Sequence, residues 1–157
     1  MRSLGLLVLV ACTPVEVEVR GACVARDGVL IPGTQRSTAS LMFTIDDLGA
    51  LQELAEIDGE LILDRIAIEP VDGSPNIAEA DATMTAADLP ALELSCGRGM
   101  CMDDGAIVLS APMSPDVGAY VETGAISLDV SVKGSLPAEA WVADLAVCMT
   151  GNFEHDL

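Results

Sequence analysis

The chain has 157 residues, a length that suits one domain with its own core. Its formal net charge of −18 opposes binding to nucleic acids and to anionic membrane surfaces, because both attract basic proteins. Hydrophobic residues make up 51% of the sequence but aromatic residues only 3%, so few side chains can stack on sugars or bases. We therefore expect an acidic protein with an aliphatic core and no nucleic-acid partner.

The first eleven residues have the layout of an export signal. Arg2 supplies a positive charge, Leu4 to Val10 form an apolar run, and Ala11 is the small residue that precedes a cleavage site. The run is too short to cross a bilayer, which takes about 20 apolar residues. An ordinary secretion signal cut elsewhere, or a buried first strand, are the alternatives. Pro14 disfavours the strand because proline lacks a backbone donor.

The four residues Leu9-Val10-Ala11-Cys12 resemble the lipobox of bacterial lipoproteins. The resemblance implies a signal peptide over 1–11, cleavage before Cys12, and a diacylglyceryl group on its thiol with a further acyl chain such as palmitate on the new N-terminus. Two or more acyl chains hold a protein stably at a membrane. Residues 12–14 would form a lipidated tether. In that family Thr13 favours the outer membrane, so the resemblance implies an exported, envelope-bound protein.

Residues 15–153 are predicted to form a single β domain, followed by a C-terminal tail over 154–157. Val15 to Arg20 alternates strictly between apolar and charged residues, which predicts a strand with one solvent-exposed face. Continuing this alternation places Cys23 on the inner face with the valines. Asp27-Gly28 predicts a turn, and Thr38 to Ile45 predicts a second strand.

Asp46 and Asp47 precede an apolar spacing of three residues that begins at Leu48 and runs to Ile57. This spacing predicts one short amphipathic helix, with the two aspartates as its cap. We expect the helix to pack as a lid over one end of the sheets.

The longest apolar alternation lies in 61–71, with Ile62, Ile66 and Ile68 assigned to one face of a strand. A turn over 72–76 predicts that 77–85 pairs with this strand as a hairpin. The remaining chain predicts strands over 92–96, 106–111, 126–133 and 141–152, and one helical turn near 117–121.

About eight short strands, one short helix and no alternation of strands with long helices predict an antiparallel β-sandwich of the immunoglobulin-like or jelly-roll-like kind. The pattern from Gly124 to Pro137, together with this layout, resembles small bacterial surface lipoproteins that carry such sandwiches.

Lipidation of Cys12 would leave an even set of four cysteines, Cys23, Cys96, Cys101 and Cys148. In an exported domain this predicts two disulfides, with three possible connectivities. We favour Cys96–Cys101, which closes a short loop, and Cys23–Cys148, which would link the first and last strands. Strand alternation places Cys148 on the outer face, which opposes the second pair unless a bulge redirects one cysteine. Neither zinc ligation nor a redox motif fits the spacing.

Histidine-based catalysis is not expected, because His155 is the only histidine and lies in the predicted tail. We assign no catalytic residue and no cofactor beyond the covalent lipid.

Calcium is the strongest metal hypothesis, because this ion takes oxygen ligands from loops. The candidate ligands are acidic residues beside predicted turns, without the spacing of a calcium loop, and aspartate is also an ordinary turn residue. They are Asp46, Asp47, Asp72, Asp103 and Asp104.

The sequence thus predicts a non-enzymatic, lipid-anchored envelope protein that acts as a structural or interaction module. The alternative is a surface domain that binds calcium or a small ligand through acidic loops, and an exported enzyme that uses carboxylates ranks lowest. Its partners would be the membrane, through the lipid, and a protein or small ligand of unknown identity. The oligomeric state stays open.

Overall fold

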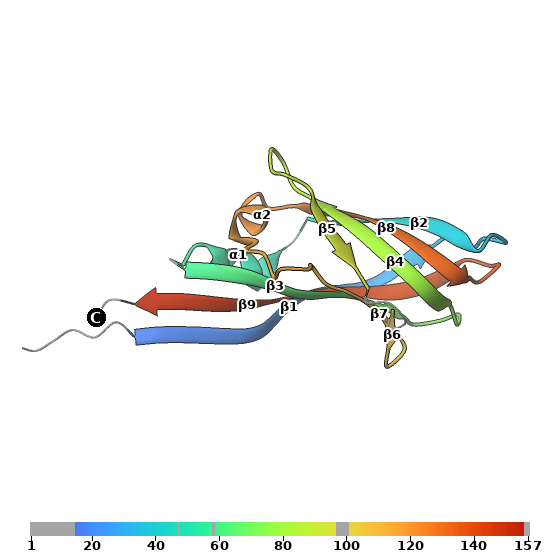
Figure 1. The fold of residues 1–157 in the computed structure, drawn as a ribbon, viewed down its shortest axis with the longest axis horizontal. Coiled ribbons are helices and arrows are strands. Elements are labelled where there is room, and N and C mark those ends of the chain that lie inside the picture. Colours follow the sequence, from blue (N-terminus) through green and yellow to red (C-terminus); the bar gives the residue numbers. More distant parts are fainter. Residues whose placement is uncertain (1–14, 47, 58, 97–100, 156–157) are drawn as a thin grey trace, which may run out of the picture.

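The structure, a computed structural model, describes residues 15–46, 48–57, 59–96 and 101–155. It is an antiparallel β-sandwich with two short helices, which confirms the predicted fold class (Figure 1). Cys12, the predicted signal segment and Asp47 lie outside the described residues.

Two antiparallel sheets form the layers of the sandwich. The five-stranded sheet A has the order β1-β9-β3-β7-β6, and the four-stranded sheet B has the order β2-β8-β4-β5. Most connections cross from one sheet to the other. The strands of sheet A are β1 (Val15–Ile31), β3 (Gly59–Pro70), β6 (Met102–Asp103), β7 (Ala106–Leu109) and β9 (Trp141–His155), and those of sheet B are β2 (Thr38–Ile45), β4 (Asn76–Thr85), β5 (Leu92–Ser95) and β8 (Ile126–Ser135).

The core lies between the sheets because the strands alternate apolar and polar residues with a period of two. In β8, the buried residues Ile126, Leu128, Val130 and Val132 alternate with exposed polar residues, as predicted. In β9, the residues from Trp141 to Met149 at odd positions are buried in the same core. Apart from Phe43, Tyr120, Trp141 and Phe153, the buried side chains are aliphatic or sulfur-containing.

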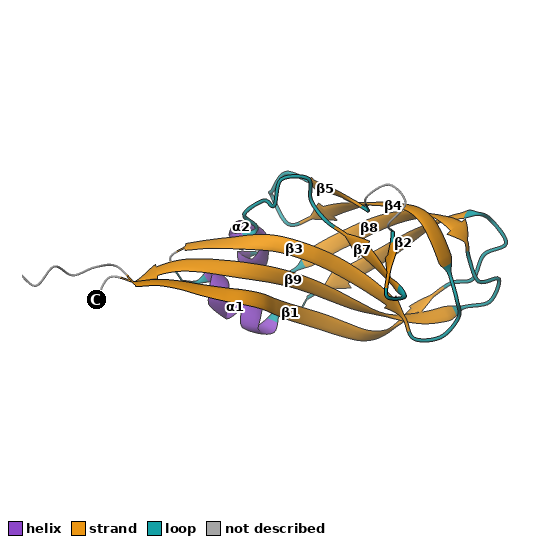
Figure 2. Ribbon diagram, turned by 60° about the horizontal axis from the view of Figure 1, so that its bottom comes forward, coloured by secondary structure: helices purple, strands orange, loops and turns teal. Residues whose placement is uncertain are grey.

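Strands β1, β3 and β9 extend beyond the end of sheet B, which makes the molecule elongated (Figure 1). The helices α1 (Gly49–Ala55) and α2 (Gly118–Glu122) cover the inner face of this extension (Figure 2). The lid position predicted for the first helix is therefore correct. The N-cap of α1 is Leu48, without a side-chain hydrogen bond, so the predicted aspartate cap is wrong. No helix in the described ranges is long and apolar enough to span a membrane.

Strand β1 continues through the predicted Asp27-Gly28 turn, which is a bulge instead. The register against β9 shifts between Val19 and Ala22 and again between Arg26 and Val29. The glycines at the two shifts, Gly21 and Gly28, have positive φ values of 66° and 68°, which residues with a side chain rarely adopt.

The first bulge reverses the alternation of β1. Ala22 and Val24 therefore face the core, and Cys23 lies on the outer face opposite Cys148. The predicted inner position of Cys23 is wrong for this reason, and the correction removes the objection to its pairing with Cys148.

A bulge in β3 also changes the faces of that strand. The register against β9 shifts between Leu63 and Arg65, so Leu61 and Leu63 share the inner face with Ile66 and Ile68. Ile62 lies on the other face, and its predicted grouping with these two isoleucines is wrong.

The pairing predicted between 61–71 and 77–85 is also wrong. The chain crosses from sheet A to sheet B after β3, and β4 pairs with β5 and β8. At the C-terminus, β9 continues to His155, which pairs with Val15, so the strand runs two residues beyond the predicted domain end at 153.

Candidate binding site along strand β2

The two long sides of the sandwich differ in how they are closed. On the side of β5 and β7, Ser95 and Ser110 exchange backbone hydrogen bonds of 3.0 and 3.1 Å that join sheet B to sheet A. The disulfide Cys96–Cys101 follows directly on the same side. On the opposite side, the edge strands β1 and β2 are not paired with each other in the described part of the chain.

An apolar groove lies on the open side, between the end of β1 and the middle of β2. Its volume is about 290 Å³, and apolar side chains provide most of its lining. Leu30 and Met42 at its rim expose 69% and 79% of their surface, whereas Ile31, Leu41 and Phe43 are buried. The lining residues are Val29, Leu30, Ile31, Pro32, Ser40, Leu41, Met42 and Phe43.

Arg26 spans the open side at one end of β2. Its guanidinium donates a hydrogen bond to the carbonyl oxygen of Thr44, so one side chain of sheet A contacts the backbone edge of sheet B. The β1 bulge next to Arg26 is held by Asp144 of β9, whose carboxylate accepts a hydrogen bond of 2.8 Å from the N–H of Gly28.

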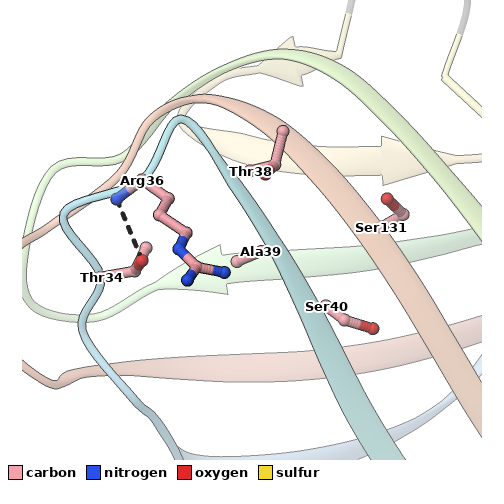
Figure 3. Close-up of a pocket in the computed structure, with 6 residues that line it drawn as sticks. All are labelled: Thr34, Arg36, Thr38, Ala39, Ser40 and Ser131. Carbon is pink, nitrogen blue, oxygen red and sulfur yellow. Dashed lines mark hydrogen bonds between the residues drawn. The ribbon is translucent and has the colours of Figure 1, made fainter.

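A polar hollow of about 480 Å³ lies beside the groove, where the loop between β1 and β2 meets the start of β2 (Figure 3). Its lining combines the guanidinium of Arg36 with four hydroxyl groups. Arg36 forms no side-chain hydrogen bond or ion pair with any residue of the described ranges, although the chain is strongly acidic. The other lining residues are Thr34, Thr38, Ala39, Ser40 and Ser131.

Contacts with the β8–β9 connection hold the loop that carries Arg36. The N–H of Thr34 donates to the carbonyl of Pro137 at 2.9 Å. Gly33 packs directly on the backbone of Ala138 and Glu139, where an added Cβ would collide. Within the loop, the hydroxyl of Thr34 accepts a hydrogen bond of 3.1 Å from the N–H of Arg36. The loop therefore has a defined conformation at the mouth of the hollow.

The outer face of sheet B continues the polar surface away from the hollow. Three side-chain interactions connect neighbouring strands: Ser40 donates to Asp129 at 2.8 Å, Thr83 donates to Glu93 at 3.2 Å, and Lys133 forms an ion pair with Glu79 at 3.2 Å. Hydroxyls and carboxylates thus alternate across this sheet. Such a surface can donate to and accept from a hydroxylated ligand.

A carboxyl group with a shifted pKa lies near the start of β1, far from the groove and the hollow. The guanidinium of Arg20 beside Glu18 in β1 lowers the pKa of that carboxyl, mainly by a hydrogen bond of 2.7 Å. No charged or polar side chain among the described residues is fully buried.

The predicted calcium ligands that the structure describes lie in or beside three separate connections. Asp46 follows β2, Asp72 lies in the β3–β4 connection, and Asp103 and Asp104 lie at the β6–β7 turn. The carboxylate of Asp72 accepts a hydrogen bond from the N–H of Val142. No group of three or more metal-ligating side chains occurs in the ranges that the structure describes.

Both favoured cysteine pairs form disulfides. Cys23 and Cys148 join the adjacent strands β1 and β9, with 4.1 Å between their Cα atoms. Cys96 and Cys101 lie 4.8 Å apart by the same measure and enclose residues 97–100, which fall outside the described residues.

Neither the groove nor the hollow is predicted by the sequence. One signal was visible: Thr38 to Ile45 contains no charged residue, glycine or proline, which is unusual for a strand at the edge of a sheet. The edge position itself follows only from the topology.

No protein-family model matches the chain. No curated protein matches it either. Among solved structures, one of turnip yellow mosaic virus is similar, with 14% identity and a TM-score of 0.37 over 100% of this chain and 90% of that chain. A structure from work on the promiscuous specificity of carbohydrate-binding modules of the β-sandwich superfamily has 14% identity and a TM-score of 0.30, over 93% of this chain and 58% of that chain.

Proposed function

We propose that the protein is a non-enzymatic binding module held at the bacterial cell envelope by lipid on Cys12. The observation that carries the proposal is the distance along β1 between its first residue and the groove. Strand β1 begins three residues after Cys12 in the sequence, is 17 residues long and ends at the groove. At 3.3 Å per residue, the strand spans about 50 Å from its first residue to the groove. Figure 1 shows the start of β1 and strand β2 toward opposite ends of the molecule, so an anchor just before β1 would hold the binding side away from the membrane.

Charge and cysteine chemistry support the same placement. A net charge of −18 repels anionic lipid headgroups, so attachment would depend on acyl chains and not on surface charge. Two disulfides suit an oxidising compartment outside the cytoplasm. Both properties fit an exported protein that faces away from the bilayer.

Fractionation of cells that express the full chain tests the anchor. The wild type is expected in the membrane fraction after a wash with 1 M salt, because acyl chains resist salt that screens surface charge within about 3 Å. Cys12→Ala is expected in the soluble exported fraction, and Cys96→Ala serves as the control because it removes a cysteine of the short-loop disulfide but leaves the lipobox intact. Equal membrane retention of the wild type and Cys12→Ala would contradict the proposal.

A second candidate function, binding of a small hydroxylated anion, is favoured by the polar hollow. A guanidinium binds carboxylates through two parallel hydrogen bonds, and the surrounding hydroxyls can both donate to and accept from sugar hydroxyls. Arg36 is available for this role, because it has no side-chain partner in the described part of the chain.

Thermal unfolding with glucuronate and with glucose tests this candidate. Ligand at 100 times its Kd stabilises a protein by about 2.7 kcal/mol. We expect glucuronate, but not glucose, to raise the Tm, and Arg36→Gln to abolish the rise. Equal responses to both sugars, or an unchanged response in Arg36→Gln, would exclude a carboxylate site at Arg36.

A further inference from the structure

Strand β2 has one backbone edge that pairs with no other strand of the described ranges. It pairs with β8 alone in the described residues. In an antiparallel strand, the N–H and C=O groups of successive residues point to opposite sides, so every second residue can pair with the neighbour. The side to which the backbone groups of one residue point therefore fixes the side for every other residue of the strand.

Two hydrogen bonds identify the residues that point to the open edge. The N–H of Gly134 donates to the carbonyl of Ser37 at 2.8 Å, so Ser37 faces the β8 side and the next residue faces away. At the other end of β2, the carbonyl of Thr44 accepts the guanidinium of Arg26, so Thr44 also faces away from β8. Both observations give the same alternation. The backbone groups of Ser40 and Met42 therefore lie on the open edge, between these two ends.

This edge lacks the features that protect edge strands from pairing with other chains. Proteins usually guard such strands with bulges, charged side chains or proline. Strand β1, the edge of sheet A, has bulges at Gly21 and Gly28 and carries several charged residues. Strand β2 has eight residues in unbroken register, and none is charged, glycine or proline.

The apolar groove lies beside the same edge. A strand added to β2 would direct alternate side chains into the space between the two sheets, next to Ile31 of β1 and to Leu41 and Phe43 of β2. The free backbone groups select an extended chain, and the groove selects apolar side chains at every second position. Recognition by strand addition combines these two features.

The structure favours an isolated segment over a second copy of this chain. In a β2–β2 pair, Leu41 and Phe43 of each copy would remain buried in their own core, and the groove would stay unfilled. A dimer would also bring together two molecules that each have a net charge of −18, and these would repel each other. A positively charged segment would instead be attracted to the acidic protein.

We propose that β2 binds an extended, positively charged segment of a partner protein as an additional strand, with apolar side chains at alternate positions in the groove between β1 and β2. The inference rests on the binding-module part of the proposed function and not on the anchor, because it specifies the partner of that module.

Hydrogen exchange and peptide binding test the proposal on the full chain carrying Cys12→Ala, so that the result does not depend on lipid. The probe is a capped ten-residue peptide of alternating valine and lysine. In the free protein, we expect the amides of Ser40 and Met42 to exchange rapidly and those of Leu41 and Phe43 slowly. The peptide should slow exchange at Ser40 and Met42. A version with N-methyl groups on alternate residues keeps the charge but removes backbone donors, and it should not protect them.

Substitutions at one position separate backbone pairing from charge. Met42→Pro removes an N–H that β8 does not use and should weaken peptide binding about tenfold, the effect of one backbone bond. Met42→Thr retains the N–H and should bind as the wild type does. If Met42→Pro fails to fold, the N-methyl peptide provides the same comparison on the unsubstituted strand.

Three results would overturn the proposal: no protection at Ser40 and Met42, equal binding of the N-methyl peptide, or protection without peptide in a dimer detected by ultracentrifugation. Membrane retention through Cys12 is measured separately. A failed peptide test therefore leaves the anchor proposal standing, and a failed anchor test leaves the strand proposal standing.

Discussion

Replacing each disulfide with two alanines should lower stability by very different amounts, because the two bonds close loops of very different length. Cys23–Cys148 spans a sequence separation of 125 residues, and Cys96–Cys101 spans 5. The loop-entropy relation gives about 5 kcal/mol for the long loop and about 2 kcal/mol for the short one at 25 °C. The difference of about 3 kcal/mol depends only on the ratio of the two loop lengths.

Urea unfolding of the full chain carrying Cys12→Ala measures this difference. Trp141 is the only tryptophan and is 3% exposed, so its fluorescence reports unfolding of the core. The control is the same titration with reductant, in which the loss of both crosslinks should bring the wild type and the two alanine pairs close together. Any gap that remains under reductant reports packing at the substituted sites. Equal losses for the two pairs, or a larger loss for the short loop, would refute the entropic argument.

Three further predictions concern packing, the loop and charge. Leu63→Ala should lower the free energy of unfolding by about 2–5 kcal/mol, because Leu63 is 1% exposed. Leu30 is 69% exposed, so Leu30→Ala should change this free energy by less than about 0.5 kcal/mol. Urea titrations that show similar losses for the two variants would contradict the assigned core. Gly33→Ala should cost about 1–3 kcal/mol, because its Cβ would meet the backbone of Glu139, whereas Gly118→Ala has room and should be nearly neutral. In an NMR titration, the pKa of Glu18 should lie below its ordinary value and return to it in Arg20→Ala. The stability that this pair contributes is present at neutral pH and is lost as the pH falls through the lowered pKa. An unchanged pKa of Glu18 in Arg20→Ala would exclude this pair as the cause.

The parts of the fold that could be predicted are those in which local sequence and burial agree. Residues 126–133 alternate without interruption, and the structure buries one face of β8 as that alternation requires. The same holds for Trp141 to Met149 in β9. A period of two with one apolar face depends on nothing outside the strand itself.

The parts that could not be predicted depend on the partner strand. A bulge shifts the alternation by one residue and reverses every later side chain. This is why Cys23 and Ile62 were assigned to the wrong faces, although the glycine at 21 was visible in the sequence. The crossover between β3 and β4 also depends on which sheet each strand joins, and a turn sequence alone does not specify it.

The candidate site could not be predicted for the same reason, because it depends on contacts between distant parts of the chain. The uncharged run from Thr38 to Ile45 predicted a strand, but its open edge follows from the order of strands in sheet B. Arg36 lines the hollow because Thr34 contacts Pro137, about one hundred residues further along the chain. Contacts of this range have no local signal in a single sequence.

Mass spectrometry of the N-terminal peptide, purified from the membrane fraction of expressing cells, tests the central claim most directly. We expect a peptide that begins at Cys12 and carries a diacylglyceryl group together with a further acyl chain. A peptide that begins at Met1, or an unmodified Cys12, would contradict the lipid anchor from which the orientation of the binding side was inferred.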